Sequence, residues 1–472
     1  MIEDLEYFES EDFKEILRQY EESVKSGVRI YMDADDLTDI ADFYHYNNRL
    51  AEAEEAITLA MEYNPEAVGP MLYKAREALE AKDFKTAEEY ADKVQPLDSL
   101  EAVYLRAEIL ITQKEVDNAD QLLVQYTKEI PDDEFPDFVK GVVGMYLDYD
   151  LFTKALEWIA RTTYADSEGF KELMARTLFG LGKYKDSEKL FNELLDKNPY
   201  SANYWKALAG VQYMKEDYSA ALTSSEYAIA INPNDTDGLL SKANTLYTMG
   251  NYDEALKCFQ KYSEKKPDDE FSYLHQAVCL INKGSYKEGL EILKKAISVS
   301  AIDSSYLPEI YQEMAFTYNV LGNMDKALWC LDMTDQLDCD HFHMGTVKGH
   351  ILLANHKENE AKKVFDKVLL ESDNDPKVKL RIIISYHDNK YLQFAYNAYS
   401  DFFNTVDDDF REGYAYMALC CNELSKNDEF LYYLKKACDY NPGETKAVLG
   451  EFFPDDMDPK DYYDYALKHS ND

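Results

Sequence analysis

The stretch Pro131-Asp132-Asp133-Glu134-Phe135 recurs further along the chain as Pro267-Asp268-Asp269-Glu270-Phe271. The two copies are 136 residues apart, which is four times 34. A period of about 34 residues is typical of stacked helix-turn-helix units, because such a unit buries its apolar face only against its neighbours. The recurrence therefore predicts an all-α repeat array rather than one globular core.

The turn inside each predicted unit is marked by a glycine followed two residues later by an aromatic residue or methionine. These turns read Gly182-Lys183-Tyr184, Gly250-Asn251-Tyr252, Gly284-Ser285-Tyr286 and Gly322-Asn323-Met324. Glycine ends the first helix of the unit there, since it tolerates the backbone conformation that follows a helix. Prolines at 65, 131, 199, 233, 267 and 442 stand just past helical runs and mark the ends of units.

Small residues recur at a fixed offset in each helix of the unit. In the first helices they are Ala41, Ala75, Ala107, Ala175, Ala209, Ala243, Ala277, Ala315 and Ala418. In the second helices they are Ala53, Ala87, Ala119, Ala155, Ala221, Ala255, Ala327 and Ala361, with Gly289 as a departure. A larger side chain at these places would push the paired helices apart.

One unit carries a nearly complete family pattern, formed by Trp205, Leu208, Ala209, Tyr218, Ala221, Ala228 and Pro233. This pattern resembles the tetratricopeptide repeat family. Alignment on it predicts about twelve units, beginning near residues 34, 68, 100, 136, 168, 202, 236, 270, 308, 342, 376 and 411. The last two depart from the pattern: either Phe394 or Ala395 is the small position of one, and Phe430 occupies it in the other.

The resemblance implies a right-handed superhelical solenoid of helix-turn-helix repeats. We expect a capping helix within residues 1–33, repeats one to eight over residues 34–307, repeats nine to twelve over residues 308–442, and capping helices over residues 443–472. The N-terminal cap is predicted over residues 10–26, where apolar residues recur with helical spacing. At the other end, Tyr462 is expected to pack inward or to lie at a dimer contact.

The net negative charge of the chain argues against two classes of binding partner. The chain has 91 acidic and 50 basic residues, a formal charge of −41, which repels nucleic acids and anionic membranes. The acidity could serve solubility, recognition of a basic partner, or both. Residues 1–6 lack the basic start and apolar stretch of a signal peptide, and no apolar run is long enough to span a membrane, so we expect a cytoplasmic protein.

No catalytic motif is recognisable, and we expect neither an enzyme nor a bound cofactor. Cys339, His341 and His343 alternate in a predicted loop and could supply three metal ligands. Ordinary loop residues are the favoured interpretation, because the next candidate, His350, lies about 10 Å along a helix from His343. The seven cysteines are expected to be free thiols.

In the family that the chain resembles, positions 2, 5, 6, 9, 12 and 13 of the first helices face a concave groove. The resemblance therefore assigns acids, aromatic residues and a local basic group to the groove, with Glu309, Glu313 and Phe316 among its further members. The main candidates are Asp35, Asp39, Asp42, Tyr73, Glu101, Tyr104, Glu108, Lys140, Arg176, Asn203, Lys206, Tyr213, Asn244, Tyr247 and Phe271.

From these residues we predict a non-catalytic scaffold that binds basic or amphipathic segments of cytoplasmic proteins in an acidic groove. The alternative is a peptide-sensing receptor whose superhelix changes conformation when a peptide binds. Partner identity and oligomeric state stay open at this point, because one fold serves many functions.

Overall fold

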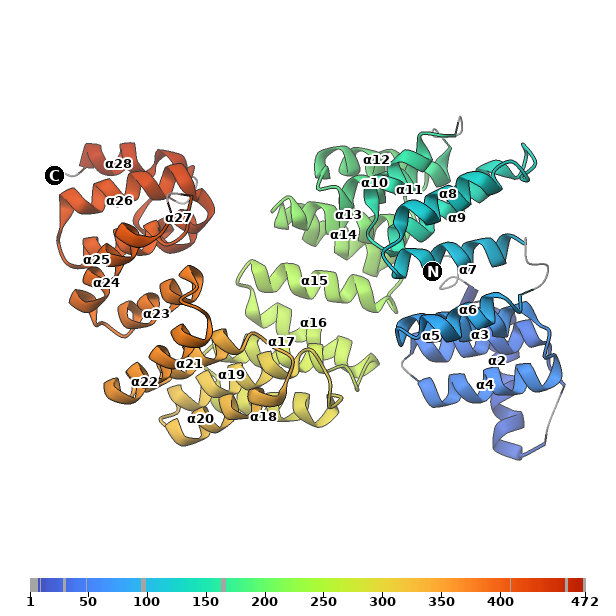
Figure 1. Cartoon of the computed structure of the whole chain (residues 1–472), viewed down its shortest axis with the longest axis horizontal. Coiled ribbons are helices and arrows are strands. Elements are labelled where there is room, and N and C mark those ends of the chain that lie inside the picture. The colour runs from blue at the N-terminus through green and yellow to red at the C-terminus, as the bar shows by residue number, and fades with distance from the viewer. Residues whose placement is uncertain are drawn as a thin grey trace. The chain divides into compact units, whose positions relative to one another are not determined.

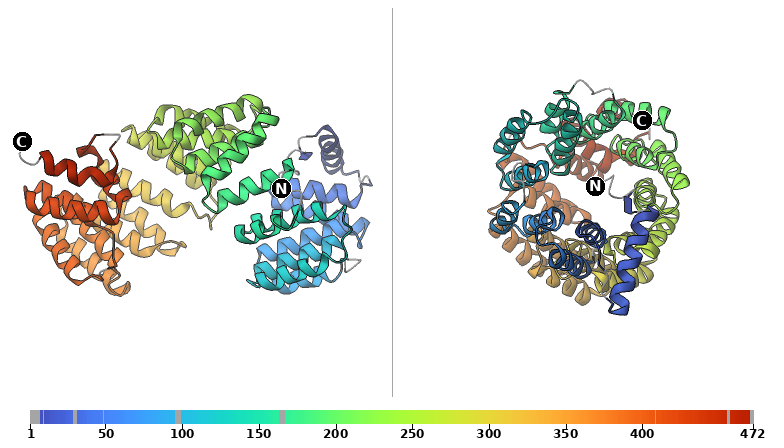
Figure 2. Two further views of the ribbon diagram at one scale, coloured as in Figure 1. Left: turned by 90° about the horizontal axis from the view of Figure 1, so that it is seen from above. Right: turned by 90° about the vertical axis from the view of Figure 1, so that its right-hand side faces the viewer.

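The computed structural model describes residues 7–469 except 9, 29–30, 48, 95–98, 163–166, 408 and 455–456. These residues form α-helices and three short 3-10 helices, and no β-strand occurs among them. Figures 1 and 2 show the helices following one another as helix-turn-helix pairs. The prediction of an all-α helical repeat protein is confirmed.

The chain divides into two compact units, unit 1 (Met1–Glu216) and unit 2 (Asp217–Asp472). This boundary lies inside the segment that the sequence assigns to repeats one to eight. The four domain ranges given above therefore stay a prediction. Each unit is described by itself below.

Unit 1 consists of one leading helix, five helix pairs and a final first helix. They are α2 (Glu11–Ser26); α3 (Ala34–Tyr46) and α4 (Leu50–Tyr63); α5 (Val68–Glu80) and α6 (Phe84–Ala91); α7 (Leu100–Thr112) and α8 (Val116–Tyr126); α9 (Phe135–Asp148) and α10 (Phe152–Ile159); α11 (Glu168–Gly180) and α12 (Tyr184–Lys197); and α13 (Ala202–Met214). Helix α2 is capped by Ser10, whose hydroxyl accepts a hydrogen bond from the Phe13 amide. The buried Phe13 ring lies 5.3 Å from the Phe43 ring of α3.

Unit 2 begins with a second helix and continues with six pairs and a terminal cap. They are α14 (Tyr218–Ile231); α15 (Thr236–Thr248) and α16 (Tyr252–Lys265); α17 (Glu270–Asn282) and α18 (Tyr286–Val299); α19 (Leu307–Val320), α20 (Met324–Asp332) and the 3-10 helix η1 (Met333–Gln336); α21 (His341–Ala354) and α22 (Glu358–Glu371); α23 (Pro376–Asp388) and α24 (Leu392–Thr405); α25 (Tyr414–Glu423) and α26 (Asn427–Tyr440); then α27 (Pro442–Leu449), η2 (Gly450–Phe452), η3 (Pro459–Asp461) and α28 (Tyr462–His469). Tyr462 is buried and its ring stacks on Phe453 at 3.9 Å, so it packs inward.

The first helices begin within one residue of the predicted unit starts, except α25, which begins three residues late. Gly413, which caps the start of α25, has a left-handed backbone with a φ of 88°, so the helix begins only after it.

The small position of the eleventh repeat is settled by burial. In α24, Ala395 is fully buried and Phe394 is 54% exposed, so Ala395 occupies the small position. The alanines that set the register are all fully buried, as close helix pairing requires.

Two glycines take the place of alanine at this close contact. A Cβ added to Gly289 of α18 would lie 2.8 Å from Ile281 Cγ1 and 3.2 Å from the Ala277 carbonyl oxygen. A Cβ added to Gly349 of α21 would lie 2.1 Å from the Phe365 ring. The departure at Gly289 therefore reflects closer packing and leaves the repeat register intact.

The turn between the two helices of a unit requires one residue with a left-handed backbone. Gly250 has a φ of 75°, and Lys114 occupies the same place in another unit with a φ of 67°. Glycine adopts this conformation without steric cost, whereas a residue with a Cβ is strained there. Units without the glycine thus keep the same turn at a cost in stability.

All seven cysteines are free, and six of them are buried. None of the described helices is both long and apolar enough to cross a membrane.

Candidate partner-binding surface

The candidate residues lie on the first helices and fall into two sets. Unit 1 carries Asp35, Asp39, Asp42, Tyr73, Glu101, Tyr104, Glu108, Lys140, Arg176, Asn203, Lys206 and Tyr213, and unit 2 carries Asn244, Tyr247 and Phe271. We call the surface formed by the predicted groove positions the first-helix face of each unit.

In unit 1, Glu108 is held by a residue that the sequence analysis missed. Arg76 Nε of α5 lies 3.4 Å from Glu108 Oε2 of α7, and the Glu108 side chain is only 14% exposed. Burial raises the pKa of Glu108, while the Arg76 charge acts to lower it. Arg76 stands at position nine of its repeat, as Asp42 and Glu108 do in theirs, so the same alignment could have found it. Glu108 therefore links two repeats.

Two tyrosines of unit 1 also bridge consecutive first helices. Tyr73 is buried, with its hydroxyl 3.1 Å from His45 Nδ1 of α3. Tyr104 donates its hydroxyl proton to the Phe138 carbonyl oxygen of α9 at 3.1 Å. Burial raises the pKa of both hydroxyls. These two side chains stabilise the stack and offer little surface to a partner.

The remaining acids of unit 1 differ in how far they are engaged. Asp39 is hydrogen-bonded to the Tyr7 hydroxyl, and the charge of Asp42 acts on Arg76. Asp35 and Glu101 are exposed. Among the four candidate acids other than Glu108, the exposed ones are therefore Asp35 and Glu101.

The predicted basic group spans α9, α11 and α13. Lys140 is paired with Asp137 of its own helix at 2.8 Å. Asn203, Lys206 and Tyr213 are half-buried and have contacts within the chain. Arg176 is also half-buried. The three basic residues thus lie on consecutive first helices, with at least Lys140 and Lys206 engaged internally.

In unit 2, four rings form a continuous line that we call the aromatic row. The Phe271 ring stacks on His275 at 4.0 Å and meets the edge of Tyr306 at 5.5 Å, and Tyr247 lies 6.1 Å from His275. Asn244 is half-buried on the same helix as Tyr247. The row therefore runs across the first helices α15 and α17 to the residue that precedes α19.

Two glutamates of α19 lie beside the aromatic row. The Glu313 charge acts on the Tyr247 hydroxyl, and the Glu309 charge acts on His275 and Tyr306. Burial raises the pKa of Glu313, and the neighbouring Glu309 raises it further. Among the described residues no ion pair involves either glutamate. Glu313 is half-buried whereas Glu309 is exposed, so Glu313 is the acid of the two that is partly withdrawn from water.

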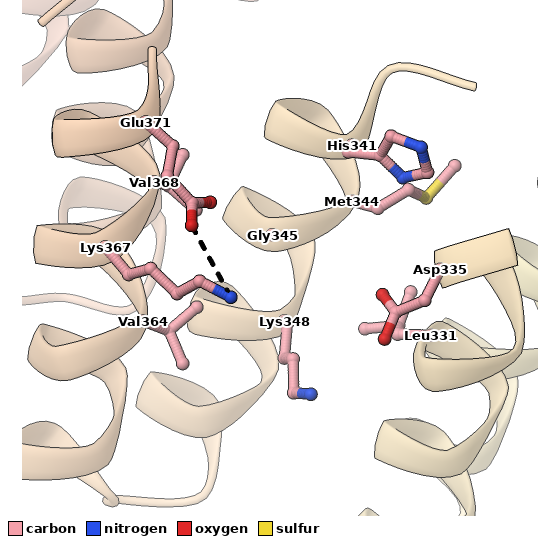
Figure 3. Close-up of a pocket in the computed structure, with 10 residues that line it drawn as sticks. All are labelled: Leu331, Asp335, His341, Met344, Gly345, Lys348, Val364, Lys367, Val368 and Glu371. Atoms are coloured by element: carbon pink, nitrogen blue, oxygen red, sulfur yellow. Dashed lines mark ion pairs between the residues drawn. The ribbon is translucent and has the colours of Figure 1, made fainter. Parts of the chain in front are cut away.

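Unit 2 also contains a cavity of about 330 Å³ between consecutive second helices (Figure 3). Its lining comes from the end of α20 and η1 (Leu331, Asp335), from α21 (His341, Met344, Gly345, Lys348) and from α22 (Val364, Lys367, Val368, Glu371). Helix α20 has nine residues and is followed directly by the 3-10 helix η1, whereas α22 has fourteen residues. Lys348 is paired with Asp332, and Lys367 with Glu371 at 3.7 Å.

A second cavity, of about 400 Å³, occupies the equivalent place in unit 1. It is lined by Glu88, Ala91, Asp92, Arg106, Ile109, Leu110, Gln113 and Leu122. Residues of α6, a second helix with only eight residues, form one side of this cavity. Both cavities thus lie beside a short second helix, and each is lined by apolar and charged residues.

The three residues named as possible metal ligands, Cys339, His341 and His343, do not all lie in the predicted loop. His341 and His343 begin α21, so the prediction of a loop at these residues is wrong. His343 Nε2 lies 2.8 Å from Gln312 Oε1 of α19, whereas Cys339 Sγ lies 3.7 Å from His341 Nδ1. Over the described part of the chain, no three His, Cys, Asp or Glu side chains are grouped closely enough to hold a metal ion.

Comparison with known families gave two overlapping matches. The family described as "Tetratricopeptide repeat" matches residues 173–236, and the family described as "Anaphase-promoting complex, cyclosome, subunit 3" matches residues 214–296. No curated protein matches the chain.

Several solved structures are similar over part of the chain. MamA from Desulfovibrio magneticus RS-1 is 14% identical with a TM-score of 0.33, covering 35% of this chain and 92% of its own. A tetratricopeptide repeat protein from Parabacteroides merdae is 14% identical with a TM-score of 0.40, covering 53% and 97%. YrrB, described as having an unusual peptide-binding site, is 20% identical with a TM-score of 0.31, covering 38% and 89%.

The two family matches cover helices α12 to α17 completely, where the alanine positions and glycine turns are most regular. The same helix lengths and buried alanines continue in both directions from there. The chain therefore contains tetratricopeptide repeats, identified by family match over residues 173–236.

Proposed function

We propose that this protein is a non-catalytic scaffold that binds a basic segment of a partner protein on the first-helix face of unit 2. Tetratricopeptide repeats are in general a protein-interaction fold, because stacked helix pairs present one long continuous surface. The observation that carries the proposal is the placement of Glu309 and Glu313 beside the aromatic row.

A cationic side chain fits this place for two physical reasons. A carboxylate that is partly withdrawn from water is stabilised by a guanidinium or ammonium group brought to it. The flat rings of Phe271 and Tyr306 also attract a cation over their faces and cover the apolar stem of an arginine or lysine. A segment with one basic residue flanked by apolar residues satisfies both demands.

In this proposal the exposed acids of unit 1 attract the partner and do not select it. Its acids Asp42 and Glu108 are engaged with Arg76, whereas Asp35 and Glu101 are exposed. Exposed acids of this kind mainly attract a basic partner over a distance and raise its association rate. We therefore assign selectivity to Glu313, which is half-buried beside the aromatic row, and attraction to the exposed acids, Glu309 among them.

Selection from a random peptide library displayed on phage tests the proposal without a known partner. The full-length chain is expected to select peptides enriched in arginine or lysine next to apolar residues. The double variant Glu309→Gln/Glu313→Gln should lose that enrichment. The matched control is Glu264→Gln/Glu288→Gln, which removes the same charge from exposed positions of the second helices α16 and α18.

The control should select the same peptides as the unmodified chain. Selection of acidic or uncharged peptides would contradict the proposal. Equal loss of enrichment in both double variants would assign the effect to total charge instead of to position.

A further inference from the structure

One contact between consecutive first helices of unit 2 depends on a neutral histidine. His350 of α21 is half-buried, and its ring meets the edge of Phe316 of α19 at 6.2 Å. On its other side, His350 Nδ1 lies 3.3 Å from Nδ2 of Asn389, which directly follows α23. The His350 ring of α21 therefore contacts both α19 and the residue that caps the end of α23.

The hydrogen bonds around Asn389 show which atom donates. Its Nδ2 donates to the Ser385 carbonyl oxygen at 2.8 Å and approaches the His350 carbonyl oxygen at 3.4 Å. Two carbonyl oxygens near one amide group identify that group as the NH₂ end. Nδ1 of His350 must then accept, so the ring carries its proton on Nε2. This bond exists only while the imidazole is neutral.

Neighbouring histidines make contacts that tolerate a proton. His343 Nε2 faces the Gln312 side-chain oxygen at 2.8 Å, and His387 Nε2 faces the Glu423 carboxylate at 2.7 Å. In both cases the ring nitrogen is the donor, and it remains one in the imidazolium form. Among these three bridges between first helices, the one at His350 is the bond that a proton would remove.

The charged group that acts on His350 is Asp388, the last residue of α23, while α19 presents the Phe316 ring. Asp388 Oδ1 also lies 3.7 Å from Nδ1 of His387. Burial lowers the pKa of His350, and Asp388 opposes this shift. A protonated ring would repel the Asn389 amide and be attracted to Asp388 instead.

We propose that His350 and Asn389 form an acid-sensitive seam between α21 and α23, which is closed when His350 is neutral and loosens when it is protonated. The seam is a property of unit 2 whether or not its first-helix face binds a basic segment. Seven of the eight histidines lie in unit 2, and the histidine of unit 1, His45, is the exception. The response to mild acid is therefore expected in unit 2.

The direction in which stability changes with pH follows from the linkage between protonation and folding. A histidine whose pKa is lower in the folded state binds protons more readily when its surroundings open. Its contribution to stability is full above the pKa of the unfolded chain and is lost as the pH falls through the folded-state pKa. The seam should therefore open below about pH 6.5, the ordinary value for histidine.

Amide hydrogen exchange of the full-length chain tests this directly. As the pH falls from about 7.5 to about 5.5, amides of α23 should exchange faster than the intrinsic pH effect accounts for. His350→Asn places an acceptor oxygen near the position of Nδ1 and cannot titrate, so it should abolish the acceleration. His341→Asn, at an exposed position of the same helix, should behave as the unmodified chain does.

A second variant covers the case in which His350→Asn does not fold. Asn389→Ala removes the donor and should leave the amides of α23 equally weakly protected at both pH values, once the intrinsic pH effect on exchange is taken into account. Unchanged protection of α23 in the unmodified chain at the lower pH would overturn the proposal. Persistence of the acceleration in His350→Asn, or full protection of α23 in Asn389→Ala, would overturn it as well.

Discussion

Arg76 and Glu108 form an ion pair between two consecutive first helices, with Nε and Oε2 3.4 Å apart. The pair is asymmetric, because the Glu108 side chain is 14% exposed and the Arg76 side chain is 57% exposed. Glu108 therefore depends on Arg76 for charge compensation more than Arg76 depends on Glu108.

Replacement of Arg76 by methionine keeps most of the apolar stem and removes the charge. We expect unit 1 to lose about 1–2 kcal/mol, less than a fully buried pair would cost, because water screens the exposed arginine. Urea unfolding followed by circular dichroism measures the change. Lys85→Met, which removes an exposed partner of Glu89 on α6, should be close to neutral. Equal effects of the two substitutions would contradict this account.

Ala255→Leu tests the close contact between paired helices in unit 2. Ala255 is fully buried in α16 and belongs to a core cluster with Leu239 and Ala243 of α15. The added carbons have no room, so we expect a loss of about 1–3 kcal/mol. Thermal unfolding provides the measurement, and a neutral result would place the helix contact elsewhere.

The substitution Gly349→Ala tests whether the contact between α21 and α22 requires a glycine. The new Cβ would lie 2.1 Å from the Phe365 ring, so α21 and α22 must separate or the ring must move. The better helix propensity of alanine would by itself add about 1 kcal/mol of stability. We expect a net loss in thermal stability. Gly210→Ala, where the Cβ meets open space, should instead be stabilising.

The turns make opposite predictions for two residues with the same backbone conformation. Lys114→Gly removes the strain of a side chain at a φ of 67° and should stabilise unit 1 by up to about 1 kcal/mol. Gly250→Ala, at a φ of 75°, should destabilise unit 2 by about the same amount. Chemical denaturation of each variant against the unmodified chain gives both signs, and a shared sign would be inconsistent with the turn geometry.

Salt should affect the proposed binding surface in a position-dependent way. For a basic peptide selected by the chain, affinity should fall between low salt and about 0.15 M, where the screening length is about 8 Å. Glu309→Gln/Glu313→Gln should weaken binding at both salt concentrations, whereas Glu264→Gln/Glu288→Gln should change only the salt-sensitive part. Isothermal titration calorimetry at the two salt concentrations distinguishes these outcomes.

The fold could be predicted from the sequence because its determinants are local and repeated. Each alanine contact, such as Ala243 with its partner helix, joins residues within one unit of about 34 residues, so spacing alone reveals it. The glycine turns are local in the same sense, since the backbone conformation at Gly250 depends on one residue. Family resemblance then supplied the positions that form the first-helix face.

The state of each side chain on that face was decided by the tertiary structure. Asp35 and Glu108 look alike in the sequence, yet one is exposed and the other is paired with Arg76 from the preceding repeat. Likewise, nothing in the sequence near His350 indicates that it accepts from Asn389, 39 residues away. Charge state and hydrogen bonding depend on burial and on neighbours brought together by stacking, and a pattern of residue types within one repeat does not contain that information.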